Sequence, residues 1–371
     1  MDFSFTEQQE MLRTMARDFG EKEFPKSLVR EMEKDDRGIT EELWRKIAEL
    51  GWMELIFPEE YGGLGASFLD FLVLMEEIGR ACLPGLFFAD VMLGGLIVLA
   101  AGNEEQKQAI LPELAKGKLI ATLALIEPDG GYEPSAITTE AVHDNNGYLI
   151  SGTKLFVPFA HIANRIVCIA RSNEGVTLFL VDAKNQGIKT TPLGTISGDK
   201  QSEVVFDNVK VSAGDVLGEP GKGWDALEPV LAKAKVAKCA EMVGMAQRML
   251  EMSVDYAKQR IQFDRPIGSF QVIQQYCANM LTDVETSKYL TYKAAWMLDE
   301  GIPCTREVAI AKGWTSSACR RVAALAHQIH GAMGFSADHD LGFYYKRLKE
   351  SELLFGDEEV HKEILAQEMG L

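Results

Sequence analysis

The sequence predicts an α+β protein with an N-terminal helical domain, a middle antiparallel β domain and a C-terminal helical domain. Three stretches with different hydrophobic spacing predict this order. Apolar residues recur at helical spacing to about Lys118, short β-branched runs alternate with turns to about Val216, and long helical stretches follow. Because the strands are grouped and do not alternate with helices, a βαβ fold is not expected. The expected domains are residues 1–119, 120–220 and 221–371.

The first domain is expected to consist of amphipathic helices. Thr6 is typical of a residue that caps a helix N-terminus, and no positively charged and apolar leader indicates a secretory signal. Two apolar stripes have helical spacing, namely Leu43, Ile47 and Leu50, and then Phe68, Phe71, Leu72, Met75 and Ile78. Gly62, Gly63 and Gly65 predict the turn between these two helices.

The middle domain is expected to form a small sheet from short strands at regular spacing. Its apolar runs are 148–150, 166–169 and 176–181, separated by turns that contain asparagine and glycine. Two further runs flank Asp207 and Asn208. In the last domain, the spacing predicts helices over 234–259 and 270–300 and a third from Thr305 to about His330. The helical parts of the first and last domains are expected to pack together.

Composition excludes several classes of function. The formal net charge of −17 argues against nucleic acid and against anionic membrane surfaces as partners, because both attract basic patches. The most apolar stretch, Val91 to Ala101, is far shorter than the roughly 20 residues that span a bilayer. The six cysteines lie far apart and the six histidines show no ligand spacing. We therefore expect reduced thiols, no metal and a cytoplasmic location.

Six strings occur in a characteristic order along almost the whole chain. They are Phe57–Gly65 (FPEEYGGLG), Glu127-Pro128 with Gly130-Gly131, Gly152–Val157 (GTKLFV), Val205–Trp224, Tyr256–Gln271 and Gln328–Phe335 (QIHGAMGF). Together they resemble the acyl-CoA dehydrogenase family, and a branch of it that acts on cyclic, branched or steroid-derived acyl-CoA. The resemblance implies FAD as cofactor, a C-terminal four-helix bundle and a homo- or heterotetramer. It also implies an electron-transferring flavoprotein as electron acceptor.

The resemblance assigns FAD-binding positions in two domains. They are Ile126, Phe156 and Pro158 in the middle domain, and Arg260, Gln262, Phe263, Gln271, Gln328, Gly331, Ala332 and Gly334 in the C-terminal domain. The guanidinium of Arg260 suits a diphosphate, and glycine at 331 and 334 lets backbone approach a ligand. Without the resemblance, the residues favour a surface ion pair for Arg260 and a helix C-cap and turn for the two glycines.

Enzymes of this family oxidise an acyl thioester to the α,β-enoyl thioester: a carboxylate removes the α-proton and the β-hydrogen leaves as hydride to the flavin. The usual glutamate precedes a glycine near the C-terminus, where this chain has Phe355 before Gly356. A second position used in the family precedes a basic residue, which places Ala234 before Lys235. Both base positions therefore lack a carboxylate. By the same resemblance Tyr132, Lys235, Leu354 and Phe355 are expected to bind substrate.

Two other carboxylates are candidates for the base. Glu241 lies two turns after Ala234 on an almost apolar helix face, where burial favours a raised pKa. It is our preferred base, and the alternative is a structural glutamate paired with Lys238 or Arg248. Asp90 is the other isolated charge in an apolar run, as a second proton acceptor or a partner for a polar substrate group. A surface or helix-terminal aspartate is its alternative.

The sequence thus predicts an FAD-dependent acyl-CoA dehydrogenase with a relocated base. Pro158 stands where a hydroxyl commonly contacts the flavin, and proline offers neither hydroxyl nor N–H. Together with the missing base, this departure leaves a second hypothesis open, a non-catalytic scaffold subunit of a heteromeric dehydrogenase.

Overall fold

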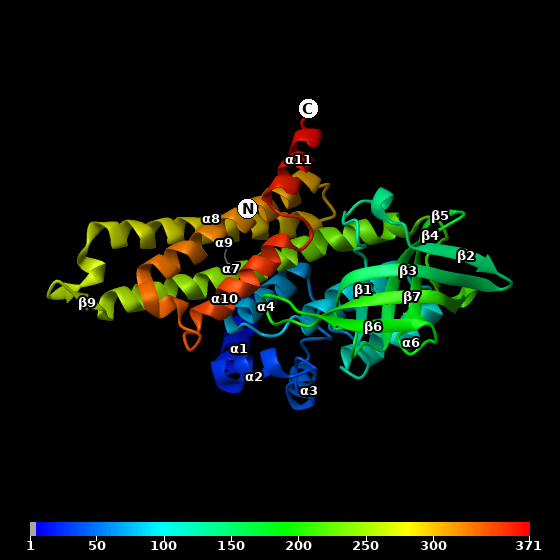
Figure 1. The fold of residues 1–371 in the computed structure, drawn as a ribbon, viewed down its shortest axis with the longest axis horizontal. Coiled ribbons are helices and arrows are strands. Elements are labelled where there is room, and N and C mark those ends of the chain that lie inside the picture. Colours follow the sequence, from blue (N-terminus) through cyan, green and yellow to red (C-terminus); the bar gives the residue numbers. More distant parts are fainter. Residues whose placement is uncertain (1–4) are drawn as a thin grey trace. The chain divides into compact units, whose positions relative to one another are not determined.

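The computed structural model describes residues 5–371, and Figure 1 shows them as a ribbon. Contacts between residues divide the chain into two units. The helical unit contains residues 5–29, 67–83 and 235–371. The sheet unit contains residues 30–66 and 84–234. Helices from both ends of the sequence therefore share one unit, as predicted, while the two boundaries between the three expected domains stay a prediction.

The helical unit is built from long helices. They are α1 (Glu7–Glu23), α4 (Phe68–Ala81), most of α7 (Gly223–Gln259), α8 (Gln271–Asp299), α9 (Thr305–His330), α10 (Leu341–Leu353) and α11 (Glu358–Glu368). The bounds of α9 confirm the predicted helix, and Thr6 caps α1 by accepting a hydrogen bond from the Gln9 amide at 3.2 Å. Helix α9 packs against α8, α10 and α11, and α8 and α9 run side by side in Figure 1.

Two glycines bring α4 and α7 into close contact. A Cβ added to Gly79 would lie 2.0 Å from the backbone oxygen of Glu241, and one added to Gly244 would lie 1.8 Å from that of Glu76. Any side chain at either position would force the helices apart. This crossing fixes where the Glu241 backbone lies in the helical unit.

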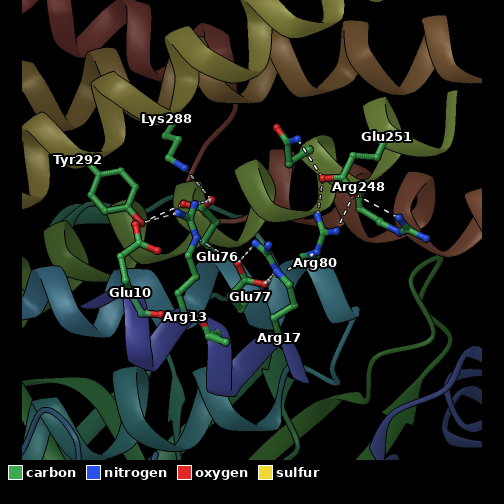
Figure 2. A network of polar contacts seen from close by, with 12 residues as sticks. Glu10, Arg13, Arg17, Glu76, Glu77, Arg80, Arg248, Glu251, Lys288 and Tyr292 are labelled. Carbon is green, nitrogen blue, oxygen red and sulfur yellow. Dashed lines mark hydrogen bonds and ion pairs between the residues drawn. The ribbon is translucent and has the colours of Figure 1, made fainter. Parts of the chain in front are cut away.

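A network of ion pairs joins α1, α4, α7 and α8 beside that crossing (Figure 2). Glu76 accepts hydrogen bonds from Arg13 at 3.1 Å, Lys288 at 3.0 Å and the Tyr292 hydroxyl at 2.9 Å. Glu77 accepts a bond from Arg17 at 2.6 Å. Both glutamates are buried, and buried carboxylates are tolerated when cations and donors surround them. The network therefore ties the N-terminal helices to the C-terminal ones.

The sheet unit holds an eight-stranded sheet. Its strands are β1 (Ala121–Ala124), β2 (Glu140–Asp144), β3 (Gly147–Pro158), β4 (Arg165–Ser172), β5 (Gly175–Asp182), β6 (Ile188–Leu193), β7 (Gln201–Ser212) and β8 (Val216–Leu217). The order is β6-β7-β3-β2-β4-β5-β8, and β1 pairs with β4. The ladders are antiparallel except for β1–β4 and a single β2–β4 bridge. The α+β class with a main sheet from the middle of the chain is confirmed.

Shorter elements complete the chain. They are α3 (Glu41–Glu49), α5 (Leu96–Ala101), α6 (Glu104–Ala115), the π-helix η2 (Phe88–Gly95) and, in the helical unit, the hairpin β9 (Ile261–Gln262) and β10 (Arg265–Pro266); α2 (Lys26–Lys34) runs from one unit into the other. The two apolar runs that flank Asp207 and Asn208 belong to one strand, because β7 continues through both residues. The extra residue is absorbed as a bulge opposite Ser151, with Asn208 at φ +49°. Across residues 5–371, we find no helix with the length and apolarity needed to span a membrane.

Candidate active site

Glu241 lies on α7 in the helical unit, and its carboxylate is buried. Its Oε2 accepts a hydrogen bond from Lys238 Nζ at 2.6 Å, one turn earlier on the same helix. The two side chains are only 7% and 8% exposed. Its Oε1 has no hydrogen-bond partner among residues 5–371. The structure therefore shows the ion pair that the sequence left as an alternative, and leaves one carboxylate oxygen available.

Asp90 lies in the sheet unit, on the π-helix Phe88–Gly95, and is fully buried. Its Oδ1 accepts a hydrogen bond from the Ala121 amide at 2.7 Å, while Oδ2 has no partner among the described residues. Burial raises the pKa of Asp90 well above its usual range, and the bond from the Ala121 amide opposes this only in part. Burial therefore favours the neutral form of Asp90, and the predicted alternative of a surface aspartate is wrong.

The two positions where the family carries its base hold buried apolar side chains, Ala234 in the sheet unit and Phe355 in the helical unit. Phe355 is 3% exposed and adopts a left-handed backbone conformation with φ +62°. Its carbonyl oxygen lies 3.2 Å from His361 Nε2. Burial lowers the pKa of His361, and the charges of Lys312 and Lys235 add to this, to about 3. Leu354 and Lys235 are half-buried.

The predicted flavin positions of the sheet unit lie near one end of β3. Phe156 is 52% exposed, with φ +55°. Ile126 is half-buried, and its carbonyl accepts a hydrogen bond from the Leu155 amide at 2.8 Å. The carbonyl of Pro158 accepts one from Thr122 at 2.6 Å. The exposed ring of Phe156 fits stacking against a flat aromatic group, while Pro158 supplies no donor.

A buried ion pair holds the segment after Ile126 to β3. Lys154 Nζ donates to Glu127 Oε1 at 2.6 Å, and the carboxylate also accepts bonds from the amides of Thr138 at 2.9 Å and Thr139 at 3.0 Å. Burial opposes ionisation of Glu127, but the bonds from Lys154 and Thr138 outweigh it and lower its pKa to about 2. Tyr132 is half-buried and lies in the loop that begins at Glu127.

Most of the predicted FAD positions of the helical unit are exposed. They are Arg260, Gln262, Phe263, Gln271, Gln328, Gly331 and Ala332, whereas Gly334 is buried. The guanidinium of Arg260 has no hydrogen-bonding or ionic partner in the part of the chain that the structure describes. Gly331 ends α9 with φ +57°, and no atom lies within 4 Å of where its Cβ would stand. An unpaired guanidinium and an open glycine turn fit an anionic dinucleotide.

Sequence reasoning missed two buried cations, Lys154 and Lys312. Each has 0% of its surface exposed. The sequence signal for each was a single lysine within an apolar segment. Such a lysine is expected to be buried, and a buried lysine needs a partner. The partner of each lies far along the chain, so the sequence alone does not identify it.

Family models of three domains match the chain. The acyl-CoA dehydrogenase N-terminal domain matches residues 6–118, the middle domain residues 122–209 and the C-terminal domain residues 221–370. The chain belongs to the acyl-CoA dehydrogenase family. Its members are FAD-dependent oxidoreductases that act on acyl-CoA, so the predicted family, enzyme class and cofactor are confirmed.

Particular relatives cover the full chain. A 3-(aryl)acrylate reductase of Clostridium sporogenes is 33% identical, over 98% of this chain and 99% of its own. A caffeyl-CoA reductase-Etf complex subunit of Acetobacterium woodii is 30% identical over 98% of each. The solved acyl-CoA dehydrogenase of Geobacillus kaustophilus is 28% identical, with a TM-score of 0.94 over 100% of both chains.

Proposed function

We propose that this chain interconverts a saturated acyl-CoA and its α,β-unsaturated counterpart, with Glu241 as the group that removes the α-proton. The observation that carries the proposal is the buried Glu241 carboxylate with one unengaged oxygen, on a helix of a chain whose usual base position holds Phe355. Bound FAD would supply the acceptor for the β-hydride. The chain's own part is to bind the thioester, exclude water and hold the proton on Glu241.

Lys238 would orient Glu241 for this role. Its ammonium engages Oε2 at 2.6 Å, which leaves Oε1 to receive the α-proton. Because both groups are almost fully buried, their interaction is weakly screened by solvent. Lys238 would also remain as a charged hydrogen-bond donor to the carboxyl group after the proton has arrived.

The remaining site positions are proposed by their family correspondence. Tyr132, Lys235, Leu354 and Phe355 would contact the acyl-CoA. Asp90 would face a polar group of the acyl chain, since a carboxyl group whose Oδ2 has no partner among the described residues can still take part in a hydrogen bond. Arg260 would bind the diphosphate of FAD, and the exposed ring of Phe156 would lie against its flat ring system.

The partners are also proposals. Large apolar side chains are exposed near one end of the helical unit, namely Ile261, Phe263, Val272, Met333 and Phe335. Such exposure favours burial against further subunits, in a homo- or heterotetramer. An electron-transferring flavoprotein is the proposed redox partner, and a relative is named as a subunit of a complex with Etf. Five of the six cysteines are buried thiols, which is typical of the cytoplasm.

Reduction and reoxidation of the bound flavin can identify both the direction of the reaction and the acyl group. A relative is named as a reductase of arylacrylates, so an aryl-substituted acyl group is a candidate beside cyclic, branched and dicarboxylic ones. Purified chain should be yellow, with about one flavin per chain. Anaerobic addition of a panel of saturated acyl-CoA thioesters should bleach the flavin with at least one of them. For the reverse reaction, chemically reduced protein should be reoxidised by an enoyl-CoA.

A colourless chain that stays flavin-free after incubation with FAD would contradict the proposal and support the scaffold hypothesis. So would flavin-loaded protein that reacts with no member of either panel. Co-expression with a second chain that restores flavin binding would identify a heteromeric enzyme in which this chain is the non-catalytic subunit.

A further inference from the structure

The turn between α10 and α11 has an unusual backbone. Phe355 and Gly356 follow each other with φ +62° and +91°. A non-glycine residue in this region is strained and persists only where its surroundings hold it. A Cβ at Gly356 would lie 2.8 Å from a methyl group of Val360, so glycine is needed there for space as well. The turn therefore depends on contacts that hold it in place.

Lys312 of α9 supplies three of these contacts. Its fully buried ammonium donates to the carbonyl of Glu352 at 2.9 Å, to the carbonyl of Gly356 at 3.0 Å and to the Ser316 hydroxyl at 3.0 Å. Three donors thus meet three acceptors. The Glu352 carbonyl belongs to the last turn of α10, where carbonyls lack helical partners and a positive charge is favourable. Lys312 therefore bonds to both sides of the turn.

Two further side chains complete the turn. His361 Nε2 lies 3.2 Å from the Phe355 carbonyl and donates to it in the neutral tautomer that this contact selects. Asp357 caps α11 by accepting bonds from the amides of Glu359 at 3.1 Å and Val360 at 3.2 Å. Consecutive carbonyls at 355 and 356 thus each have a side-chain donor, so the turn has little freedom to relax.

Burial makes a charged lysine costly at this place. It lowers the pKa of Lys312 to about 8, and the ammonium form still predominates at neutral pH. An apolar side chain would avoid this cost but would leave two buried carbonyls without donors. Two of the three hydrogen bonds of Lys312 reach carbonyls of Glu352 and Gly356 outside α9. Stabilisation of α9 alone therefore does not account for a lysine at this position.

We propose that Lys312 is a positioning residue that holds the turn Leu354–Asp357 in its strained conformation and thereby fixes the ring of Phe355 for binding of the acyl group. The proposal rests on the proposed function for its second half. Its first half, that Lys312 holds the turn, is independent of any activity.

Hydrogen exchange in a peptide spanning residues 353–361 tests the first half. The amide of Leu354 donates to the Glu350 carbonyl just before this segment, and those of Gly356 and His361 donate to carbonyls within it. In a Lys312→Met variant of the full chain, their exchange should accelerate by about tenfold or more relative to wild type. Lys349→Met is the matched control, because the one hydrogen bond of this half-buried lysine among the described residues is to the Glu352 side chain in the same helix end, at 3.1 Å. Its exchange should match wild type.

Ser316→Ala serves if the Lys312 variant does not fold. It removes one of the three acceptors of the ammonium and should accelerate exchange of the same peptide by a few-fold. Unchanged exchange in the folded Lys312→Met variant would overturn the proposal, as would unchanged exchange in Ser316→Ala if that variant alone folds.

Stopped-flow reduction of the flavin tests the second half. With an acyl-CoA that bleaches the wild type, Lys312→Met should raise the Kd of the thioester and slow reduction, each by about tenfold, while Lys349→Met should change neither. Faster exchange with unchanged Kd and rate would overturn the positioning role and leave a structural lysine. If no thioester reduces the wild type, the proposed function fails, and the exchange measurement still decides whether Lys312 holds the turn.

Discussion

Glu241 and Asp90 are both buried carboxyl groups on apolar helical segments, but their surroundings differ. Glu241 lies on the regular helix α7 and has an ammonium 2.6 Å away. Asp90 lies on a π-helix, receives one backbone hydrogen bond and, among the described residues, has no cation as a hydrogen-bonding partner. Short π-helical segments occur often at functional sites. Sequence patterns around the two residues look alike, because both are single acids within apolar runs.

A third carboxyl group, Glu127, shows how the immediate partners of a buried acid change its pKa. Glu127 is as deeply buried as these two, yet Lys154 and the hydrogen bonds from Thr138 and Thr139 lower its pKa to about 2. Asp90, with one backbone bond, has its pKa raised well above the usual range. A buried acid is thus ionised or protonated according to its immediate partners and not according to burial alone. Variants of Glu241, Lys238 and Asp90 test whether such partners also determine which acid accepts the α-proton.

The largest effect is expected for Glu241→Gln. Glutamine can still accept the hydrogen bond from Lys238 but cannot take up the α-proton, so flavin reduction by an active acyl-CoA should slow by about 10²–10⁴-fold. The thioester should still bind. Glu228→Gln, at an exposed position of the same helix, is the control and should leave the rate unchanged. A Glu241→Gln protein that bleaches at the wild-type rate would eliminate Glu241 as the base.

Removing the partner should cost stability. Lys238→Met leaves a buried carboxylate without its cation, and we expect a loss of about 3–5 kcal/mol in the free energy of unfolding. The double variant Lys238→Met/Glu241→Leu removes both charges and should recover most of that loss. Urea unfolding of the four proteins in the cycle measures this. Equal losses in the single and double variants would show that the ion pair is not what stabilises this part of α7.

Acid should destabilise the protein through His361. Its pKa is about 3 in the folded chain against an ordinary value of 6.5, so between these values the unfolded chain binds the extra proton. The free energy of unfolding should therefore fall, as pH falls from 6.5 towards 3, by up to about 1.4 kcal/mol per pH unit from this residue. A His361→Gln variant should lose this part of the slope. An identical pH profile in the variant would contradict the assignment.

The smallest effect is expected for Asp90→Asn. Asparagine is neutral and keeps the acceptor for the Ala121 amide, and burial already disfavours the charged form of Asp90, so stability at pH 7 should change by less than about 1 kcal/mol. Asp90→Leu removes the acceptor and should cost about 1–3 kcal/mol. Thermal unfolding compares the two variants. A large loss for the asparagine variant would indicate that Asp90 is ionised, and the contrast with Glu241 would then disappear.

The family and the fold class of this protein could be predicted from local sequence patterns. Ordered strings such as Tyr256–Gln271 and the change of hydrophobic period predicted the family, the α+β class and the approximate bounds of helix α9. These features are local, because period, caps and turns depend on residues close in the chain. The same reasoning also drew attention to Phe355 and Glu241, since a missing or isolated charge is visible in the sequence alone.

The hydrogen-bonding partners and the charge of each buried polar group could be identified only from the tertiary structure. Asp90 meets Ala121, Glu127 meets Lys154, and Lys312 meets the Gly356 carbonyl across 27 to 44 positions of the sequence. No pattern in one segment specifies which donor or acceptor will arrive from another. The charge of a buried group depends on those donors and acceptors at about 3 Å, so its chemistry is fixed only when the chain has folded.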